Sequence, residues 1–338
     1  MNTFKLFAIT AFLCSAFSAP AQPSTPIKVI ENNNAQFKSD SMLSRHEGYT
    51  LVNYIVKADG SLGEVTVLFD SEVKPATEKA KKYLSNLEFE AATYQGNAHD
   101  AARFFSYTYS TAPTTNSNNN RASKGFVSDY DVIDKLIKAQ RLEKAYEHFK
   151  ELLSHTKNLN EQALFAWLKS QYFYALQDWH NYEEQLQRAY FLRKHLPKEF
   201  AVPCIQNLMQ LYLYQQDFLN AKRALLALNH VPGVNISEQA QQKAMADIAG
   251  LYQQTPTITQ SVKLDKNTPK SIGVSRSEVT LKGEGLAQLR CDAYLEPRIT
   301  LPANITAKPS YGRCNLILSS SQNSDVTITQ TGKAVVRF

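Results

Sequence analysis

The chain has 338 residues, a formal net charge of +6 and a hydrophobic content of 43%. This length is typical of two or three domains. The 37 Lys and Arg residues are spread among 31 Asp and Glu residues without forming a basic stripe, so nucleic acid is not expected as a partner.

The first 21 residues have the pattern of a secretory signal peptide. Lys5 precedes the apolar run 6–17, and Ala19-Pro20-Ala21 follows it. A basic start, a short apolar centre and an A-x-A site are typical of a signal that is cleaved on export. We therefore expect cleavage after Ala21; the alternative is an uncleaved anchor. The apolar run is shorter than the about 20 residues that cross a bilayer, and no second long run follows, so no membrane span is expected in the mature chain.

Residues 48–70, GYTLVNYIVKADGSLGEVTVLFD, predict a β-hairpin. Residues 49–56 and 64–69 alternate in polarity and are rich in β-branched and aromatic types. Asp59-Gly60 lies between them and supplies the positive φ that a tight hairpin turn needs.

The residues after the hairpin complete a β-β-α-β order. Apolar side chains at spacings of three and four predict a helix over residues 75–87, and Pro75 suits its first turn. The sequence YQGN then predicts a turn, and residues 101–109, AARFFSYTY, predict a third strand.

This order and its motifs resemble the C-terminal domain of the TonB family over residues 35–110. Glu47-Gly48, Asp59-Gly60, Leu87-Glu88-Phe89 and Gln95-Gly96 lie where that family has its Gly-rich hairpin start and its later turn. Glu90-Ala91 departs from the Pro-containing step that usually follows the Phe. The resemblance implies a small recognition domain of the bacterial cell envelope, and together with the signal peptide it implies a periplasmic protein.

In the resembled family, a receptor segment pairs along the edge of the sheet. The resemblance therefore implies that an extended partner peptide pairs near residues 101–109. Phe105, Tyr107 and Tyr109 share one face of this strand by its two-residue period and are the candidate partner-binding residues. One face of the strand is expected to pack on the predicted helix 75–87. Two alternatives are a scaffold without a binding role and an edge already covered by the linker or the repeats.

Energy transduction is not expected of this domain. Signal cleavage removes the anchor, and only about two dozen residues, with Pro23 and Pro26, lie between Ala21 and the domain. As a flexible coil such a segment spans on average about 30 Å, so no long Pro-rich spacer is present.

Two polar stretches divide the rest of the chain. Residues 111–125 belong to a Ser/Thr/Asn-rich linker, and residues 253–270 are polar and contain Pro. Such segments mark domain boundaries. We therefore expect helical repeats over residues 126–254 and a β-rich domain over residues 272–338.

The region 126–254 predicts pairs of amphipathic helices. Leu142, Trp179 and Phe218 open the second helix of each pair and lie 37 and then 39 residues apart. Two-helix repeats of this length are typical of a helical solenoid, and the region loosely resembles tetratricopeptide repeats. The aromatic residues between 167 and 182 permit either a ligand pocket or packing between helices.

The region 272–338 contains short β-rich runs separated by Gly, Pro, Asn and Ser, which predict a small antiparallel sandwich or barrel. The fold class is thus multidomain α+β. Cys291 and Cys314 flank a strand and a turn, and in an oxidising compartment they are expected to form a disulfide. Cys204 lies on an apolar helix and is expected to be buried and inert.

The sequence shows no catalytic motif: a G-x-S-x-G elbow, an H-E-x-x-H helix, a P-loop and a Rossmann fingerprint are all missing. The histidines lack metal-ligand spacing, so we expect a non-enzyme without cofactor or metal. The preferred function is a periplasmic interaction or scaffold protein that binds envelope proteins or extended peptides. The alternative is an envelope hydrolase, or a carbohydrate- or peptidoglycan-binding protein, that uses the C-terminal β-domain.

Overall fold

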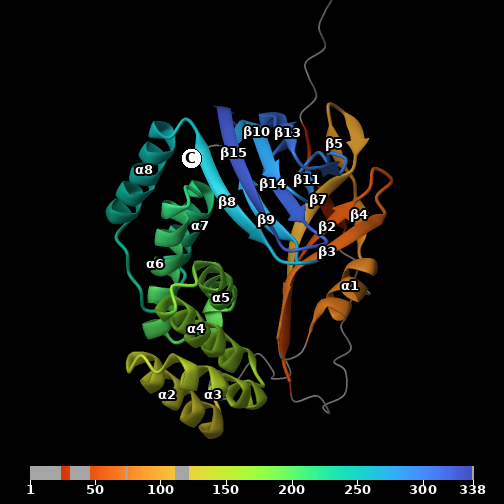
Figure 1. Cartoon of the computed structure of the whole chain (residues 1–338). Helices are drawn as coiled ribbons and strands as arrows, with labels where there is room; N and C mark the ends of the chain where they lie inside the picture. The colour runs from red at the N-terminus through yellow and green to blue at the C-terminus, as the bar shows by residue number, and fades with distance from the viewer. Residues whose placement is uncertain (1–23, 31–45, 73–74, 111–121, 337–338) are drawn as a thin grey trace, which may run out of the picture.

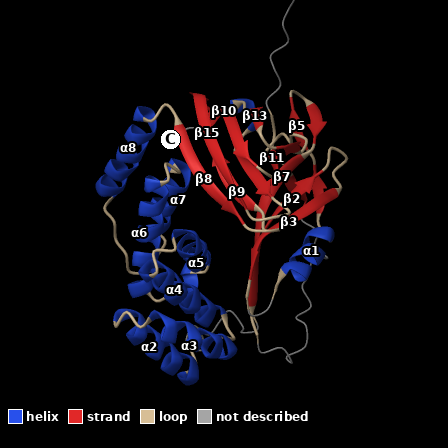
Figure 2. Cartoon of the chain, in the orientation of Figure 1, coloured by secondary structure: helices blue, strands red, loops and turns tan. Residues whose placement is uncertain are grey.

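The computed structural model describes residues 24–30, 46–72, 75–110 and 122–336. The predicted signal peptide and its cleavage site lie outside these residues, as does most of the predicted linker 111–125. The described chain is a mixed α+β protein (Figure 1). Most of its helices lie along one side of the strands, and α1 (Thr77–Ser85) lies on the other side (Figure 2).

The N-terminal sheet contains the predicted strands. Its order is β3 (Leu62–Asp70), β2 (Gly48–Val56) and β7 (Ala101–Tyr109), and both neighbouring pairs are antiparallel. α1 follows β3 and precedes β7, as the expected β-β-α-β order requires. The hairpin turn needs Gly60, because its φ is +83° and an added Cβ would lie 2.8 Å from the carbonyl oxygen of Phe89.

Between α1 and β7 the chain forms short strands that the sequence does not predict. β4 (Glu88–Glu90) pairs with β1 (Lys28–Ile30), and β5 (Ala92–Tyr94) pairs with β6 (Asn97–His99). The turn predicted at YQGN joins β5 to β6, with Gln95 and Gly96 at φ values of 53° and 81°. Strands of three residues carry too little alternation to be recognised by periodicity.

A hydrophobic cluster holds α1 against one face of the N-terminal sheet. Val52 and Val56 of β2 and Leu84 of α1 are fully buried in it. Burying an aliphatic side chain of this size contributes about 1.5–3 kcal/mol. These contacts therefore fix α1 on the sheet.

In the helical region, helices that follow one another in the sequence form antiparallel pairs, and a last helix follows the pairs. Their bounds are α2 (Lys124–Lys138), α3 (Leu142–His155), α4 (Leu159–Ala175), α5 (Trp179–Phe191), the short 3-10 helix η1 (Arg193–His195), α6 (Lys198–Tyr214), α7 (Phe218–Leu228) and α8 (Glu238–Gln254). α3, α5 and α7 begin at the three residues from which the repeat spacing was measured. In the part of the chain that the structure describes, no helix has the length and apolar character needed to cross a bilayer.

The same turn joins the helices within each pair. Gln140, Gln177 and Gln216 are left-handed, with φ values of 57°, 58° and 59°. In each case the next residue donates its N–H to the carbonyl five residues earlier, at 2.9, 3.0 and 2.7 Å. This bond is the longer one of a Schellman motif, which ends a helix with a left-handed residue. The turns therefore recur along the chain with the same spacing as the starts of α3, α5 and α7.

The C-terminal region is a β-sandwich. One sheet has the order β13 (Ala303–Thr306), β10 (Arg276–Gly283), β15 (Ser324–Ala334) and β8 (Ile258–Leu264). The second has the order β12 (Ile299–Thr300), β11 (Leu286–Cys291), β14 (Cys314–Ser319) and β9 (Lys270–Val274), with the 3-10 helix η2 (Pro309–Tyr311) before β14. Leu281 and Val326 of the first sheet and Leu289 and Leu316 of the second share one buried cluster, so the sheets pack face to face.

Cys291 and Cys314 form the predicted disulfide, between directly opposed positions of β11 and β14. The bond closes a loop with a sequence separation of 23 residues. On the chain-entropy model, a loop of this length contributes roughly 3 kcal/mol to stability. Cys204 is a free and fully buried cysteine on α6, and burial raises the pKa of its thiol to about 12.

The structure corrects the second predicted linker. Residues 253–270 were expected to separate two domains, but they contain β8, which pairs with β15 from Ile258 to Leu264. The physical reason is that Ile258, Val262 and Leu264 recur at even spacing and turn toward the protein, while the residues between them are polar. The sandwich therefore begins at residue 258, and the boundary expected at residue 272 is wrong.

Candidate functional site

β7 is an edge strand of the N-terminal sheet. It pairs with β2, and among the described residues no strand pairs with its other edge. Ser106 and Thr108 are exposed, and Phe104 is 43% exposed. An unpaired edge presents a row of backbone N–H and C=O groups to an incoming strand. Among the described residues, the part of this edge that is open to an added strand runs from Phe104 to Thr108, because Ala101 and Ala102 are buried.

The face with the candidate residues Phe105, Tyr107 and Tyr109 lies against α1. The ring of Phe105 stacks on Tyr83, with centroids 5.3 Å apart, and Tyr107 is buried in a cluster with Ala76 and Ala80. The expectation that one face of the strand packs on this helix is thus met by these aromatic residues. The face more open to a partner is the opposite one.

Tyr109 completes the contact with α1. The ammonium nitrogen of Lys79 lies 3.5 Å from the centroid of the Tyr109 ring. A cation over an aromatic face is attracted by the ring quadrupole. This contact holds the C-terminal end of β7, so the strand is anchored along most of its length.

A cavity lies beside β7, between the N-terminal sheet and the sandwich. Ala102 and Phe104 line it, and so does Arg103. Neighbouring residues of a strand point to opposite faces of the sheet. Ala102 and Phe104 therefore line the cavity from the face of the sheet that also carries Asn53, and Arg103 joins the lining from the neighbouring position of β7.

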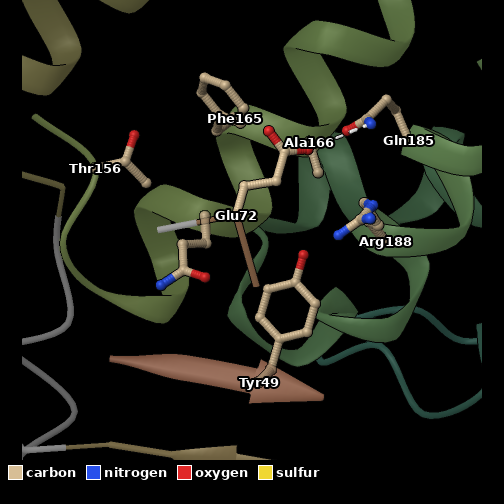
Figure 3. Close-up of a pocket in the computed structure, with 8 residues that line it drawn as sticks. Tyr49, Glu72, Thr156, Phe165, Ala166, Gln185 and Arg188 are labelled. Atoms are coloured by element: carbon tan, nitrogen blue, oxygen red, sulfur yellow. Dashed lines mark hydrogen bonds between the residues drawn. The ribbon is translucent and has the colours of Figure 1, made fainter. Parts of the chain in front are cut away.

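A second, much smaller cavity lies where the N-terminal sheet meets α4 and α5 (Figure 3). Figure 3 shows the Tyr49 hydroxyl directed toward Glu72 and Arg188. Lys169 Nζ lies 2.9 Å from a carboxylate oxygen of Glu72, and Arg188 donates a hydrogen bond of 2.5 Å to the backbone carbonyl of Asp70. With a volume of about 10 Å³, this cavity has room for no more than about one water molecule.

The groups around this small cavity connect the sheet to the helices. Burial raises the pKa of Tyr49, and the charge and hydrogen bond of Arg188 oppose that effect. Glu47 adds a further connection, because its carboxylate accepts the N–H of Leu159 at 2.8 Å, at the start of α4. We assign these contacts to the junction between the two regions rather than to a ligand site.

The structure brings together a group that the sequence analysis missed. His180, Glu184 and Asp265 place one potential metal-ligand atom each within 4.8 Å of one another. His180 and Glu184 are four residues apart on α5, which was a detectable signal, but Asp265 follows β8 and could not be placed beside them. His180 Nε2 bonds Asp265 at 2.8 Å, and Arg188 bonds Glu184 at 3.0 Å, so each side chain already has a partner within the chain.

The aromatic residues of the second helical pair serve mainly as core. Trp167, Tyr172 and Tyr182 are buried, with exposed fractions of 5–7%. Tyr174 and Trp179 remain about half exposed beside them. The sequence permitted either a ligand pocket or packing between helices, and the buried aromatic residues fit packing between helices.

Neither the known protein-family models nor the curated proteins give a match to this chain.

Proposed function

We propose that the protein is a non-enzymatic interaction or scaffold protein of the bacterial cell envelope that binds an extended peptide segment along β7. The observation that carries this proposal is that, among the described residues, β7 pairs with a strand only on the side of β2, and that its Ser106 and Thr108 are exposed. In strand addition, main-chain hydrogen bonds supply affinity and alternate side chains supply selectivity.

The contacts of β7 fit this role. α1 covers Phe105, Tyr107 and Tyr109, so these residues hold the strand in an extended form before a partner arrives. A rigid edge lowers the entropic cost of ordering on binding. In our proposal the partner's side chains then meet the opposite face, at Phe104.

The proposed location and architecture rest on two further features. The disulfide between Cys291 and Cys314 suits an oxidising compartment such as the periplasm. The β-β-α-β unit supports a TonB-like recognition module, and the paired helices with repeated turns support a tetratricopeptide-like array. We propose that the module serves recognition without energy transduction, and that the array offers a second surface to envelope proteins.

A backbone substitution tests strand addition. Envelope proteins captured by the wild-type chain are identified, and the affinity of the main one is measured for Ser106→Pro and for Ser106→Ala. Proline removes a backbone donor and adds bulk at the edge, so we expect affinity to fall roughly fivefold or more, the equivalent of about one lost hydrogen bond. Ser106→Ala keeps the N–H and should bind as the wild type does.

Circular dichroism must show that Ser106→Pro retains the fold. If the folded variant binds its partner with unchanged affinity, β7 is not the docking edge, and the helical array becomes the site to test.

A further inference from the structure

The large cavity beside β7 lies where the N-terminal sheet, the sandwich and α7 meet. Its volume is about 340 Å³. Among the described residues, four arginines line it together with one carboxylate: Arg103, Arg223, Arg290, Arg313 and Asp292. These arginines come from β7, α7, β11 and the segment just before β14. The cavity therefore exists only when the three regions are assembled.

The arginines of the cavity differ in how far their charge is neutralised. Arg290 pairs with Glu64 at 3.2 Å, and Arg313 pairs with Asp292 at 2.9 Å. Arg103 donates a hydrogen bond of 3.0 Å to the carbonyl of Ile27, which is uncharged.

Arg223 likewise has an uncharged partner. It donates a hydrogen bond of 2.9 Å to the side-chain oxygen of Asn220. Within the described residues, neither Arg103 nor Arg223 has an ion pair. By simple charge counting at neutral pH, the four arginines and Asp292 give the lining a net charge of about +3. Asp292 and Glu64, the latter from outside the lining, pair with two of these arginines, which leaves Arg103 and Arg223.

Donor groups remain available for a ligand. A guanidinium has five N–H donors in a rigid fork that matches the oxygens of a carboxylate or a phosphate. The bonds of Arg103 and Arg223 described above occupy only part of each fork. Asn315 adds an amide to the lining, and Phe104 and Ala102 add an apolar wall.

From this arrangement we propose that the cavity binds a small organic dianion, either a dicarboxylate or a phosphate monoester. The two guanidiniums that have no ion pair among the described residues match the charge of such a ligand, and the apolar wall suits its carbon skeleton. The volume falls at the lower end of the range of about 300–1,000 Å³ for small-molecule sites, so the ligand is larger than an inorganic ion. The dianion site shares Phe104 with the proposed peptide-binding face, but the proposal does not rest on peptide pairing at β7 and is tested without a peptide.

Isothermal titration of the full chain tests the proposal with four probes. Succinate and glycerol 3-phosphate represent the two sources of a dianion, and succinamide and glycerol are their uncharged counterparts. We expect saturable binding of at least one dianion and none of its uncharged counterpart. If succinate binds and glycerol 3-phosphate does not, the site is assigned to dicarboxylates. If only glycerol 3-phosphate binds, the site is assigned to phosphate esters.

Substitutions locate the binding in the cavity. Arg223 is exposed at its surface, so Arg223→Gln should fold, and we expect it to weaken binding by about tenfold or more, since a hydrogen bond to a charged group is lost. Arg103→Gln should have a similar effect. The control is Arg141→Gln, an exposed arginine in the turn between α2 and α3, which should bind as the wild type does. The proposal is overturned if neither dianion binds saturably, or if Arg141→Gln weakens binding as much as Arg223→Gln does.

Discussion

Arg290 joins the sandwich to the N-terminal sheet through its guanidinium, and the residue is only 2% exposed. It donates to the side-chain oxygens of Asn53 and Thr66, each at 2.9 Å, and to Gln288 at 2.9 Å. Glu64 balances its charge at 3.2 Å. The sequence could not indicate this connection, because Asn53 lies 237 residues away and nothing near Arg290 distinguishes it from a solvated arginine.

We predict that Arg290→Met destabilises the protein by about 2–4 kcal/mol, because it leaves the side-chain oxygen of Asn53 buried without its donor and removes one of the two hydrogen bonds of the Thr66 hydroxyl. The free energy of unfolding from urea titration measures the effect. Arg298→Met is the matched control, since Arg298 contacts the same Glu64 from a half-exposed position and should cost less than about 1 kcal/mol. Equal losses for the two variants would contradict a special role for Arg290.

Neighbouring glutamates on α5 have pKa values shifted in opposite directions. Burial raises the pKa of Glu183 above its ordinary value of 4.5, against the opposing effects of the Gln215 hydrogen bond and the charge of Lys270. At Glu184 burial acts in the same direction, but the charge of Arg188 outweighs it with the help of Lys270, and the pKa is lowered.

We predict opposite pH dependences for Glu183→Gln and Glu184→Gln. Ionisation of Glu183 destabilises the fold as pH rises from about 4.5 through its raised pKa, so Glu183→Gln gains stability relative to the wild type over that range. Ionised Glu184 stabilises the fold, so Glu184→Gln loses stability relative to the wild type as pH rises from the lowered pKa of Glu184 to about 4.5, and the difference stays constant above that pH. Urea titrations at a series of pH values measure both differences, and slopes of the same sign would refute these assignments.

At the scale of elements, the repeated turn of the helical pairs carries a local cost. Gln177 is left-handed, with φ of 58°, and its side chain is exposed. A left-handed conformation costs a residue with a Cβ about 1–2 kcal/mol, and glycine avoids this cost.

We predict that Gln177→Gly stabilises the protein by up to about 1 kcal/mol, because the added flexibility of glycine in the unfolded chain offsets part of the gain. Gln242→Gly, at an exposed position inside α8, should instead cost about 1 kcal/mol. Thermal denaturation of both variants gives the two signs. A loss of stability in Gln177→Gly would show that the glutamine contributes more than its backbone conformation costs.

The elements with strong periodicity were predictable from the sequence, and the weak ones were not. The starts of α3, α5 and α7 at Leu142, Trp179 and Phe218 follow from the repeat spacing. β8 was missed because Thr, Gln, Ser and Lys dominate its sequence, and only its pairing with β15 gives its few apolar side chains a core to enter.

On the scale of the whole molecule, the regions contact one another through buried polar groups. Glu47 bonds the start of α4, and Tyr252 of α8 donates to the carbonyl of Ser275 in the sandwich at 2.7 Å. Composition could divide the chain, but it could not show that its parts meet around a common cavity. The arginines of that cavity lie far apart in the sequence, from residue 103 to residue 313, so the cavity follows only from the tertiary structure.

Hydrogen exchange along β7, measured on the wild-type chain with and without a captured envelope partner, tests most directly whether this strand is a docking edge. We predict that the partner slows exchange of the outward-facing amides of β7, because strand addition gives them new acceptors. Exchange in α2–α8 should change much less. Unchanged exchange in β7 together with slowed exchange confined to the helices would contradict the proposed function.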